Sequence, residues 1–176
     1  MPWGLDAVPA LDRPDLLAES VAKALQAWPD ASSAQVVEID PEVADTAAMS
    51  QTYGVPLESG FNCVVISGRR DGEERVAACV VRSDTRADVN GVAKRLLDVR
   101  KASFLSRERA VSESGMEYGG ITPIGLPAAW RVLVDSRILD AGPVVLGSGV
   151  RRSKLLLPGP ALAAAPRVEV IEGLGG

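Results

Sequence analysis

Hydrophobic positions near the N-terminus recur at helical spacing. Asp12-Arg13-Pro14 is a helix start signal, and Pro29 is a stop signal. Between them the apolar residues recur every three or four positions, which places them on one face of a helix. The pattern therefore predicts an N-terminal helix within residues 1–30, with an apolar face formed by Leu17, Val21, Ala24, Leu25 and Trp28.

The clearest strand pattern lies in the middle of the chain. Residues 62–67 and 75–82 are apolar, largely β-branched runs, and segment 68–72 joins them through glycines at both of its ends. Two such runs separated by a short Gly-containing segment are typical of a β-hairpin. Because nearly every position in both runs is apolar, we expect two central strands that are covered on both faces.

Shorter segments of both kinds complete the chain. Asp40-Pro41 marks the start of a second helix, and Gly54 marks its end. Strands are predicted at 34–39, 101–104, 131–134, 144–146, 154–157 and 168–171, and helices at 42–53, 89–96, 106–111 and 161–165.

The order of these elements indicates the fold class. Strands cluster in pairs with helices between them, which favours an α+β fold with a mixed, barrel-like β-sheet surrounded by helices. The sequence shows no internal repeat, low-complexity tract or linker, so we expect one domain over residues 1–176. The glycine-rich end, 173–176, is predicted to be frayed.

Composition and charge narrow the class of protein. The 176 residues are 47% hydrophobic and 24% charged, which is ordinary for a folded globular domain. No apolar run approaches the roughly twenty residues of a membrane helix, and the N-terminus lacks a basic-then-apolar leader. We therefore expect a soluble, cytoplasmic protein. The net charge of −4 argues against indiscriminate nucleic-acid binding but allows a local basic patch.

The absence of histidine excludes several kinds of site. Without it the chain has no serine–histidine or cysteine–histidine catalysis and lacks the ligands of most zinc sites. Cys63 and Cys79 each lie within an apolar run, which predicts buried structural thiols rather than a disulfide or a metal motif. We expect no metal and no cofactor.

Segment 116–127 is rich in glycine and proline but is not a flexible linker. Its three glycines and two prolines cannot continue a helix, while Tyr118 and three aliphatic residues would anchor it to a core. One interpretation is an ordered connection between two strands, with Tyr118 as a packing anchor. The other is a rigid loop whose bare backbone lets a ligand approach the peptide N–H groups.

Segment 119–125, Gly-Gly-Ile-Thr-Pro-Ile-Gly, resembles the glycine–proline loop of the YbaK/EbsC-type aminoacyl-tRNA editing domains. This family includes the insertion domain of prolyl-tRNA synthetase. The resemblance continues in Gly54-Val55-Pro56 before a strand, in Asp135 after a later strand, and in Gly147-Ser148-Gly149. It covers residues 40–165, most of the chain, and its pieces occur in the family's order.

The resemblance implies a free-standing deacylase that hydrolyses the ester of a mischarged tRNA carrying a small amino acid. Peptide N–H groups of the loop would bind the carbonyl oxygen as it gains charge, and the substrate's ribose hydroxyl and a water would move the proton. The tRNA acceptor end is the implied partner, and an aminoacyl-tRNA synthetase is a further one. The implied catalytic residues are Asn62, Gly119, Gly120 and Thr122, and the implied substrate-binding residues are Ile121, Pro123, Asp135, Gly147, Ser148 and Gly149.

One departure from the family pattern bears on activity. Asn62 stands where the family carries a lysine, so a charge-assisted contact is replaced by an amide dipole. Either another cation supplies the charge, or the chain is a non-catalytic module that binds aminoacyl-tRNA or another small ligand. The cations that could replace the lysine charge are Lys101, Arg151, Arg152 and Lys154. These same residues either are plain surface charges or bind tRNA phosphates.

The assigned residues should lie together if the resemblance holds. We expect Asn62, residues 119–123, Asp135 and residues 147–149 to converge on one cleft. Asp135 has two interpretations, a turn residue that accepts backbone hydrogen bonds and a group that orients a ligand amine.

Overall fold

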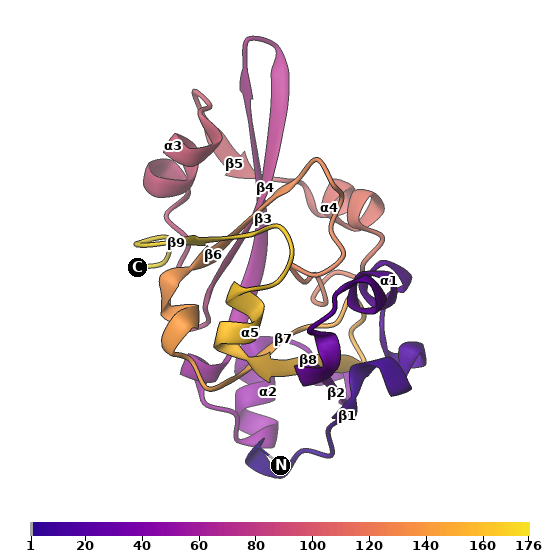
Figure 1. Ribbon diagram of the computed structural model, residues 1–176. Helices are drawn as coiled ribbons and strands as arrows, with labels where there is room; N and C mark the ends of the chain where they lie inside the picture. Colours follow the sequence, from indigo (N-terminus) through magenta and orange to yellow (C-terminus); the bar gives the residue numbers. More distant parts are fainter. Residues whose placement is uncertain (1) are drawn as a thin grey trace.

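The computed structural model describes residues 2–176 and arranges the strands in two sheets (Figure 1). β6 pairs in parallel with β4 and β9, whereas β3 pairs antiparallel with β4 and β5, so this larger sheet is mixed. Its five strands, in spatial order, are β5 (Ala102–Phe104), β3 (Phe61–Arg70), β4 (Glu73–Arg82), β6 (Arg131–Asp135) and β9 (Val168–Ile171). The second sheet is antiparallel and orders β1 (Val8–Pro9), β2 (Gln35–Glu38), β8 (Ser153–Pro158) and β7 (Pro143–Gly147).

The predicted α+β class and mixed sheet are confirmed, but the barrel-like closure is wrong. A barrel needs its two edge strands to pair with each other. Here β5 and β9 lie at opposite edges of the larger sheet, and β1 and β7 at opposite edges of the smaller one, so both sheets stay open. The helices around them are α1 (Glu19–Ala27), α2 (Thr46–Tyr53), α3 (Lys94–Leu97), α4 (Arg107–Ser114) and α5 (Gly159–Ala163).

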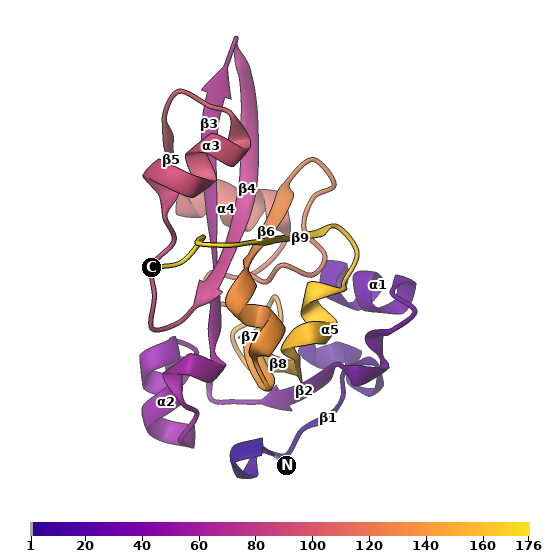
Figure 2. The same cartoon turned by 60° about the vertical axis from the view of Figure 1, so that its left-hand side comes forward.

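The β3–β4 hairpin is longer than its sequence pattern indicates. Its strands run on to Arg70 and from Glu73, so only Asp71 and Gly72 form the turn. Both turn residues have positive φ, 52° and 80°, as a tight two-residue hairpin turn requires. The hairpin therefore extends well beyond the rest of the domain at the top of Figures 1 and 2.

β4 is covered on both faces, as predicted, whereas β3 is covered only in part, since Asn62, Cys63 and Val64 are half-buried. Ala78 and Val80 of β4 belong to the main core between the sheets, whereas Ala77 and Cys79 pack on the other face against the 87–99 segment. A third apolar cluster lies where α2 and the N-terminal segment cover the smaller sheet. Among residues 2–176, no helix has the length and apolar character needed to cross a bilayer.

Two local predictions at the ends of the chain need correction. The first α-helix begins at Glu19 because the backbone N–H of Ala18 bonds to the carbonyl of Ser148 (3.2 Å) and Leu17 is extended. The 173–176 segment is not frayed: Leu174 is fully buried, and the N–H of Gly175 donates to the Asp135 carboxylate at 2.6 Å. The N–H of Gly176 bonds to the carbonyl of Arg86 as well (2.9 Å).

Candidate active site

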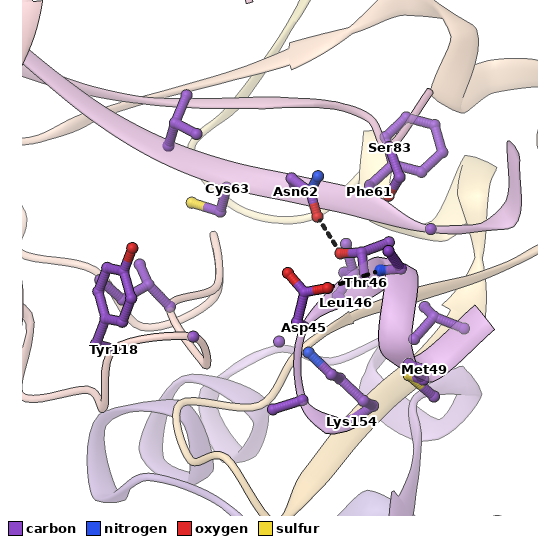
Figure 3. Close-up of a pocket in the computed structure, with 18 of the residues that line it drawn as sticks. Asp45, Thr46, Met49, Phe61, Asn62, Cys63, Ser83, Tyr118, Leu146 and Lys154 are labelled. Atoms are coloured by element: carbon purple, nitrogen blue, oxygen red, sulfur yellow. Dashed lines mark hydrogen bonds between the residues drawn. The ribbon is translucent and has the colours of Figure 1, made fainter. Parts of the chain in front are cut away.

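A cavity of about 740 Å³ opens beside the exposed edge of β3 (Figure 3). Its walls come from the start of α2, the first half of β3, the start of α4, the 118–121 loop and the adjoining ends of β7 and β8. The polar and charged side chains among its lining residues are Asp45, Thr46, Ser50, Asn62, Cys63, Ser83, Arg107, Tyr118, Arg151 and Lys154.

The cavity exists because β5 covers only part of the β3 edge. β5 pairs with residues 66–68 of β3, and the N–H of Leu105 adds one more bond to the carbonyl of Val65 (2.9 Å). Backbone groups of alternate residues point to the same side of a strand. The N–H and C=O of Cys63 therefore face the same side as those of Val65, where no strand lies over them. A donor and an acceptor of the main chain are thus presented to the cavity.

Lys154 of β8 supplies a buried cation to this cavity. Its side chain is only 7% exposed, and burial, reinforced by the neighbouring charge of Arg151, lowers the pKa of its ammonium to about 8. The Asp45 carboxylate acts in the opposite direction. Within residues 2–176, the ammonium makes no hydrogen bond and no ion pair within 4.0 Å. A buried charge without a partner is costly, and this is typical of functional sites.

Asn62 is held in a fixed orientation at the cavity wall. Its side-chain oxygen accepts a hydrogen bond from the Thr46 hydroxyl at 2.7 Å, a contact that crosses from β3 to α2 (Figure 3). The amide NH₂ of Asn62 has no partner in the part of the chain that the structure describes. Asn62, where the resemblance leads one to expect a lysine, therefore offers two N–H donors.

Asp45 is a cavity residue that the sequence analysis missed. It caps α2, with its carboxylate accepting from the N–H groups of Ala47 (3.1 Å) and Ala48 (3.3 Å). It is also the one carboxylate among the cavity-lining residues. Asp40, which the sequence analysis took as the cap, instead caps a short 3₁₀ turn at Pro41–Val43. The signal for Asp45 was its place directly before Thr46 at the helix start.

Only part of the glycine loop faces the cavity. Gly119, with φ of +85°, and Ile121 line it, and the N–H groups of these two residues have no hydrogen-bond partner in the described chain. The N–H of Gly120 donates to the carbonyl of Glu117 (2.9 Å), and a Cβ on Gly120 would lie 2.9 Å from the backbone of Val150. Gly120 is therefore required by packing and lies outside the cavity lining.

Other predicted site residues lie close behind the cavity wall. Gly147 lines the cavity, and a Cβ there would strike the carbonyl oxygen of Gly120 at 2.5 Å. Thr122, Pro123, Ser148 and Gly149 are buried and do not line it. The Ser148 hydroxyl bonds to that of Ser153 (2.7 Å). The expected convergence therefore holds for Asn62, Gly119, Ile121 and Gly147, and fails for the rest of the set.

Asp135 lies away from the cavity. Its carboxylate, 1% exposed, accepts from the N–H groups of Arg137 (2.8 Å) and Gly175 (2.6 Å). Asp135 is therefore a turn residue, one of the two interpretations, and it also anchors the last residues of the chain.

The predicted basic residues do not form one exposed patch. Arg151 lines the cavity, but its guanidinium donates to the carbonyls of Tyr118 (3.1 Å) and Pro41 (3.0 Å). Arg152 bonds to the carbonyl of Asp15. Lys154 is buried, and only Lys101 is a freely exposed cation. Arg151 and Arg152 thus hold backbone segments together.

Two aromatic side chains line the cavity mouth instead of the core. Tyr118 is 50% exposed and Phe104 is 66% exposed, so the prediction of Tyr118 as a packing anchor is wrong. The guanidinium of Arg107 lies 3.7 Å from the centre of the Tyr118 ring. Phe104 was missed by the sequence analysis, although it is one of only two phenylalanines in the chain.

Both cysteines are free thiols. Cys79 is buried as predicted, and burial raises the pKa of its thiol to about 12. Cys63 is only half-buried because it lines the cavity, and desolvation likewise raises the pKa of its thiol. A thiol held protonated at neutral pH is a poor nucleophile. In the described chain, no three Cys, Asp or Glu side chains gather as a metal site.

Comparisons with known proteins bear on the family and the fold. The family model of the aminoacyl-tRNA editing domain matches residues 40–165. A solved structure described as a candidate trans-editing enzyme for prolyl tRNA synthetase is 21% identical, covers 88% of this chain and 94% of its own, and has a TM-score of 0.74. A hypothetical protein of known structure is 20% identical over 90% of this chain and 100% of its own, also at 0.74. At these identities the likeness to the solved structures shows the fold. No curated protein matches the sequence.

Replacing Lys154 by Met should stabilise the protein. The folded-state pKa of about 8 lies below the ordinary 10.5, so the buried charge opposes folding at neutral pH. We expect Lys154→Met to raise the free energy of unfolding at pH 7 by up to about 3 kcal/mol in urea denaturation. Lys23→Met, at a side chain that is 71% exposed, is the matched control and should bring no comparable gain.

The pH dependence of stability distinguishes removal of the buried charge from better packing as the cause of the gain. Between pH 8 and 10.5 the unfolded chain binds the Lys154 proton and the folded chain does not, so wild-type stability rises with pH in that window. The difference in the free energy of unfolding between Lys154→Met and wild type should be largest below pH 8 and should fall towards zero near pH 10.5. A gap that does not change with pH, or a less stable variant at pH 7, would contradict the buried-charge account.

Proposed function

Because this chain belongs to the aminoacyl-tRNA editing domain family, we propose that it hydrolyses the ester of a mischarged tRNA that carries a small amino acid. The observation that carries the proposal is the Lys154 side chain, which is 7% exposed, lines the same cavity as Asn62 and has no hydrogen-bond or ion-pair partner within residues 2–176. The resemblance places the family lysine at Asn62, and Lys154 supplies a charge to the same cavity from β8.

The size and lining of the cavity support an aminoacyl-nucleoside as ligand. A volume of about 740 Å³ lies within the range of small-molecule sites and exceeds what an amino acid alone needs. Met49, Val55 and Leu146 form an apolar part of its wall, which suits the aminoacyl side chain. The remaining space accepts the terminal ribose and base.

Three kinds of donor are available to the carbonyl oxygen as the water attacks. With a pKa of about 8, Lys154 is mostly charged at pH 7. The amide of Asn62 and the loop N–H groups of Gly119 and Ile121 add fixed dipoles in a partly dry site. Donors that are already oriented stabilise an oxyanion without reorganisation.

The proton transfer does not need a protein base. Water adds to the ester carbonyl, the tetrahedral intermediate collapses, and the ribose oxygen leaves with the proton that the water has lost. The neighbouring ribose hydroxyl relays that proton, as the family resemblance implies. Cys63 stays protonated and takes no part as a nucleophile.

Asp45 takes the amine-orienting role that the sequence analysis gave to Asp135. The α-ammonium of an aminoacyl ester is positively charged, and Asp45 is the one carboxylate in the cavity lining. Its cap hydrogen bonds to α2 fix its position. An ion pair between the Asp45 carboxylate and this α-ammonium would orient the ester carbonyl towards Asn62 and the loop.

The alternative is a non-catalytic module of the same fold that binds aminoacyl-tRNA or another small ligand. It would follow from the missing lysine at Asn62 if Lys154 does not replace its charge. The two functions differ in a single measurable respect, the hydrolysis of the bound ester.

Lys154→Gln should therefore remove most of the deacylation activity. Loss of a charge-assisted hydrogen bond is worth about 1.5–3 kcal/mol, so we expect kcat/KM to fall about 10- to 150-fold. Asn62→Lys in the wild-type background should bring no gain, because two like charges would then crowd one cavity. Deacylation of mischarged tRNA at pH 7 is the measurement, with Lys23→Gln as the control. A wild type that is inert until Asn62→Lys is introduced would refute the compensating role of Lys154.

Asp45→Asn should weaken substrate binding without unfolding the helix start. Asn caps helices about as well as Asp, so the change removes the charge and keeps the cap. We expect KM for the mischarged tRNA to rise about tenfold, because one charge pair between the protein and the substrate ammonium is lost. Asp40→Asn, at the cap outside the cavity, is the matched control.

A substrate with a neutral amine provides the second arm of this experiment. N-acetylated aminoacyl-tRNA lacks the α-ammonium, so wild type and Asp45→Asn should treat it alike. If the variant is impaired equally on both substrates, Asp45 acts through the fold of α2 and not through the amine.

A further inference from the structure

We propose that Lys154 is an acyl-acceptor site, at which the ε-amine takes the acyl group of a small activated ester or thioester and forms an amide. This activity goes beyond the proposed function, because it needs neither tRNA nor hydrolysis. Three features of the cavity support it: the direction of the Lys154 side chain, the absence of a partner for its amine, and the hydrogen-bond donors that line the same space.

Strand pairing directs the Lys154 side chain into the cavity. Lys154 of β8 pairs with Gly147 of β7, so both residues project from the same face of the smaller sheet. Gly147 has no side chain to fill the space beside Lys154, and a Cβ there would strike the Gly120 carbonyl oxygen at 2.5 Å. In Figure 3 the Lys154 nitrogen points towards Asp45, among the other residues that line the cavity. A small molecule that enters the cavity therefore meets this amine.

The surroundings of Lys154 favour the neutral amine more than water does. The side chain is 7% exposed, and within residues 2–176 the amine makes no hydrogen bond and no ion pair. Burial lowers its pKa to about 8, the charge of Arg151 acts in the same direction, and the Asp45 carboxylate opposes both. Its strand neighbours, Val37 and Gly147, carry no charge. The other titratable side chains of the cavity lining are Cys63, Arg107 and Tyr118.

The neutral amine is the nucleophilic form of a lysine, so this environment supplies a nucleophile near neutral pH. An exposed lysine keeps its proton at that pH almost completely. The fraction of Lys154 that is neutral at pH 7 is small, but an amine attacks an activated acyl group far more readily than water does. The charged majority remains available for the role in hydrolysis proposed above.

The cavity also holds donors for the carbonyl oxygen of an acyl compound. The N–H groups of Gly119 and Ile121 and the amide NH₂ of Asn62 have no partners in the described chain. All three residues line the cavity together with Lys154. When the amine attacks, the carbonyl oxygen gains negative charge, and donors that are already oriented stabilise it. A nucleophile and unpaired donors in one cavity are the parts that acyl transfer requires.

The reaction balances without any further reagent. The neutral nitrogen attacks the acyl carbon and forms a C–N bond, and the tetrahedral intermediate then breaks its C–O or C–S bond. The leaving oxygen or sulfur takes the bonding electron pair and the proton that the nitrogen has lost. The products are an amide at Lys154 and a free alcohol or thiol. No group is oxidised or reduced, and the amide is far more stable to water than the ester or thioester.

Acylation would remove the buried charge from the cavity. If Lys154 assists hydrolysis as proposed above, the acylated protein loses that cation and its deacylase activity is switched off. This consequence rests on the proposed function, whereas the acylation itself does not.

The test is the acetylation of the folded, full-length chain at pH 7 by a limiting amount of a small acetyl donor. 4-Nitrophenyl acetate serves as the oxygen ester and S-acetyl-N-acetylcysteamine as the thioester. Peptide mapping by mass spectrometry follows each lysine separately, and Lys23 and Lys101, both exposed, are the internal references. Lys154 should be acetylated about tenfold faster than either, because more of it is neutral at pH 7.

Two controls separate the effect of the fold from that of the local sequence. In the urea-unfolded chain all the lysines should react alike. In the folded chain the preference for Lys154 should shrink at pH 10, where exposed lysines also lose their protons.

Asp45→Asn tests the electrostatic cause. The Asp45 carboxylate favours the charged amine, so its removal should raise the rate at Lys154 about twofold at pH 7. Asn keeps the helix cap. Asp40→Asn, at the cap outside the cavity lining, should leave the rate unchanged.

Faster acetylation of Lys154 by either donor supports the acceptor site, and the donor that reacts faster identifies the kind of acyl compound that fits. Three results would overturn it: a rate at Lys154 no higher than at Lys23 and Lys101 with both donors, a preference that persists in urea, and a rate that Asp45→Asn lowers or leaves unchanged. Acetylated wild type should match Lys154→Gln in the deacylation assay. Because acetylation is read by mass, a chain without deacylase activity leaves this test intact, and a chain without acetylation leaves the deacylation assay intact.

Discussion

The cavity depends on two backbone hydrogen bonds between the segment around the glycine loop and the turn after β7. The N–H of Gly149 donates to the carbonyl of Gly120 at 2.7 Å, and the N–H of Glu117 donates to the carbonyl of Gly149 at 2.8 Å. Side chains at Gly120 or Gly147 would collide with this contact. It holds the glycine loop against the turn that leads through Arg151 into β8, the strand that carries Lys154 to the cavity.

Local sequence signals predicted most elements, because helix caps and β-branched runs act over a few residues. The β3–β4 hairpin, the left-handed Gly54 and the central position of β4 follow from such signals. The barrel closure and the frayed end were wrong for a shared reason. Both depend on pairing between distant segments, such as the bond from Gly175 to Asp135, which no local pattern records.

The family resemblance predicted some of the residues that line the cavity, but not all of them. Asn62, Gly119, Ile121 and Gly147 do line one cavity. Asp45 and Phe104 were missed because their importance comes from the uncovered edge of β3, which is a property of the sheet and not of the residues. Asn62 and Lys154 line the same cavity beside this edge although 92 positions separate them along the chain.

Wild-type hydrolysis of a panel of mischarged tRNAs tests the central proposal, that this editing domain is a deacylase although Asn62 stands where the resemblance implies a lysine. The panel should run from small to bulky amino acids, at pH 7 and at pH 9, with enzyme-free hydrolysis subtracted at each pH. The account predicts hydrolysis of tRNAs that carry small amino acids, with a lower enzyme-dependent rate at pH 9, where Lys154 with its pKa of about 8 is mostly neutral. A wild type that binds these tRNAs and hydrolyses none of them at either pH would contradict it.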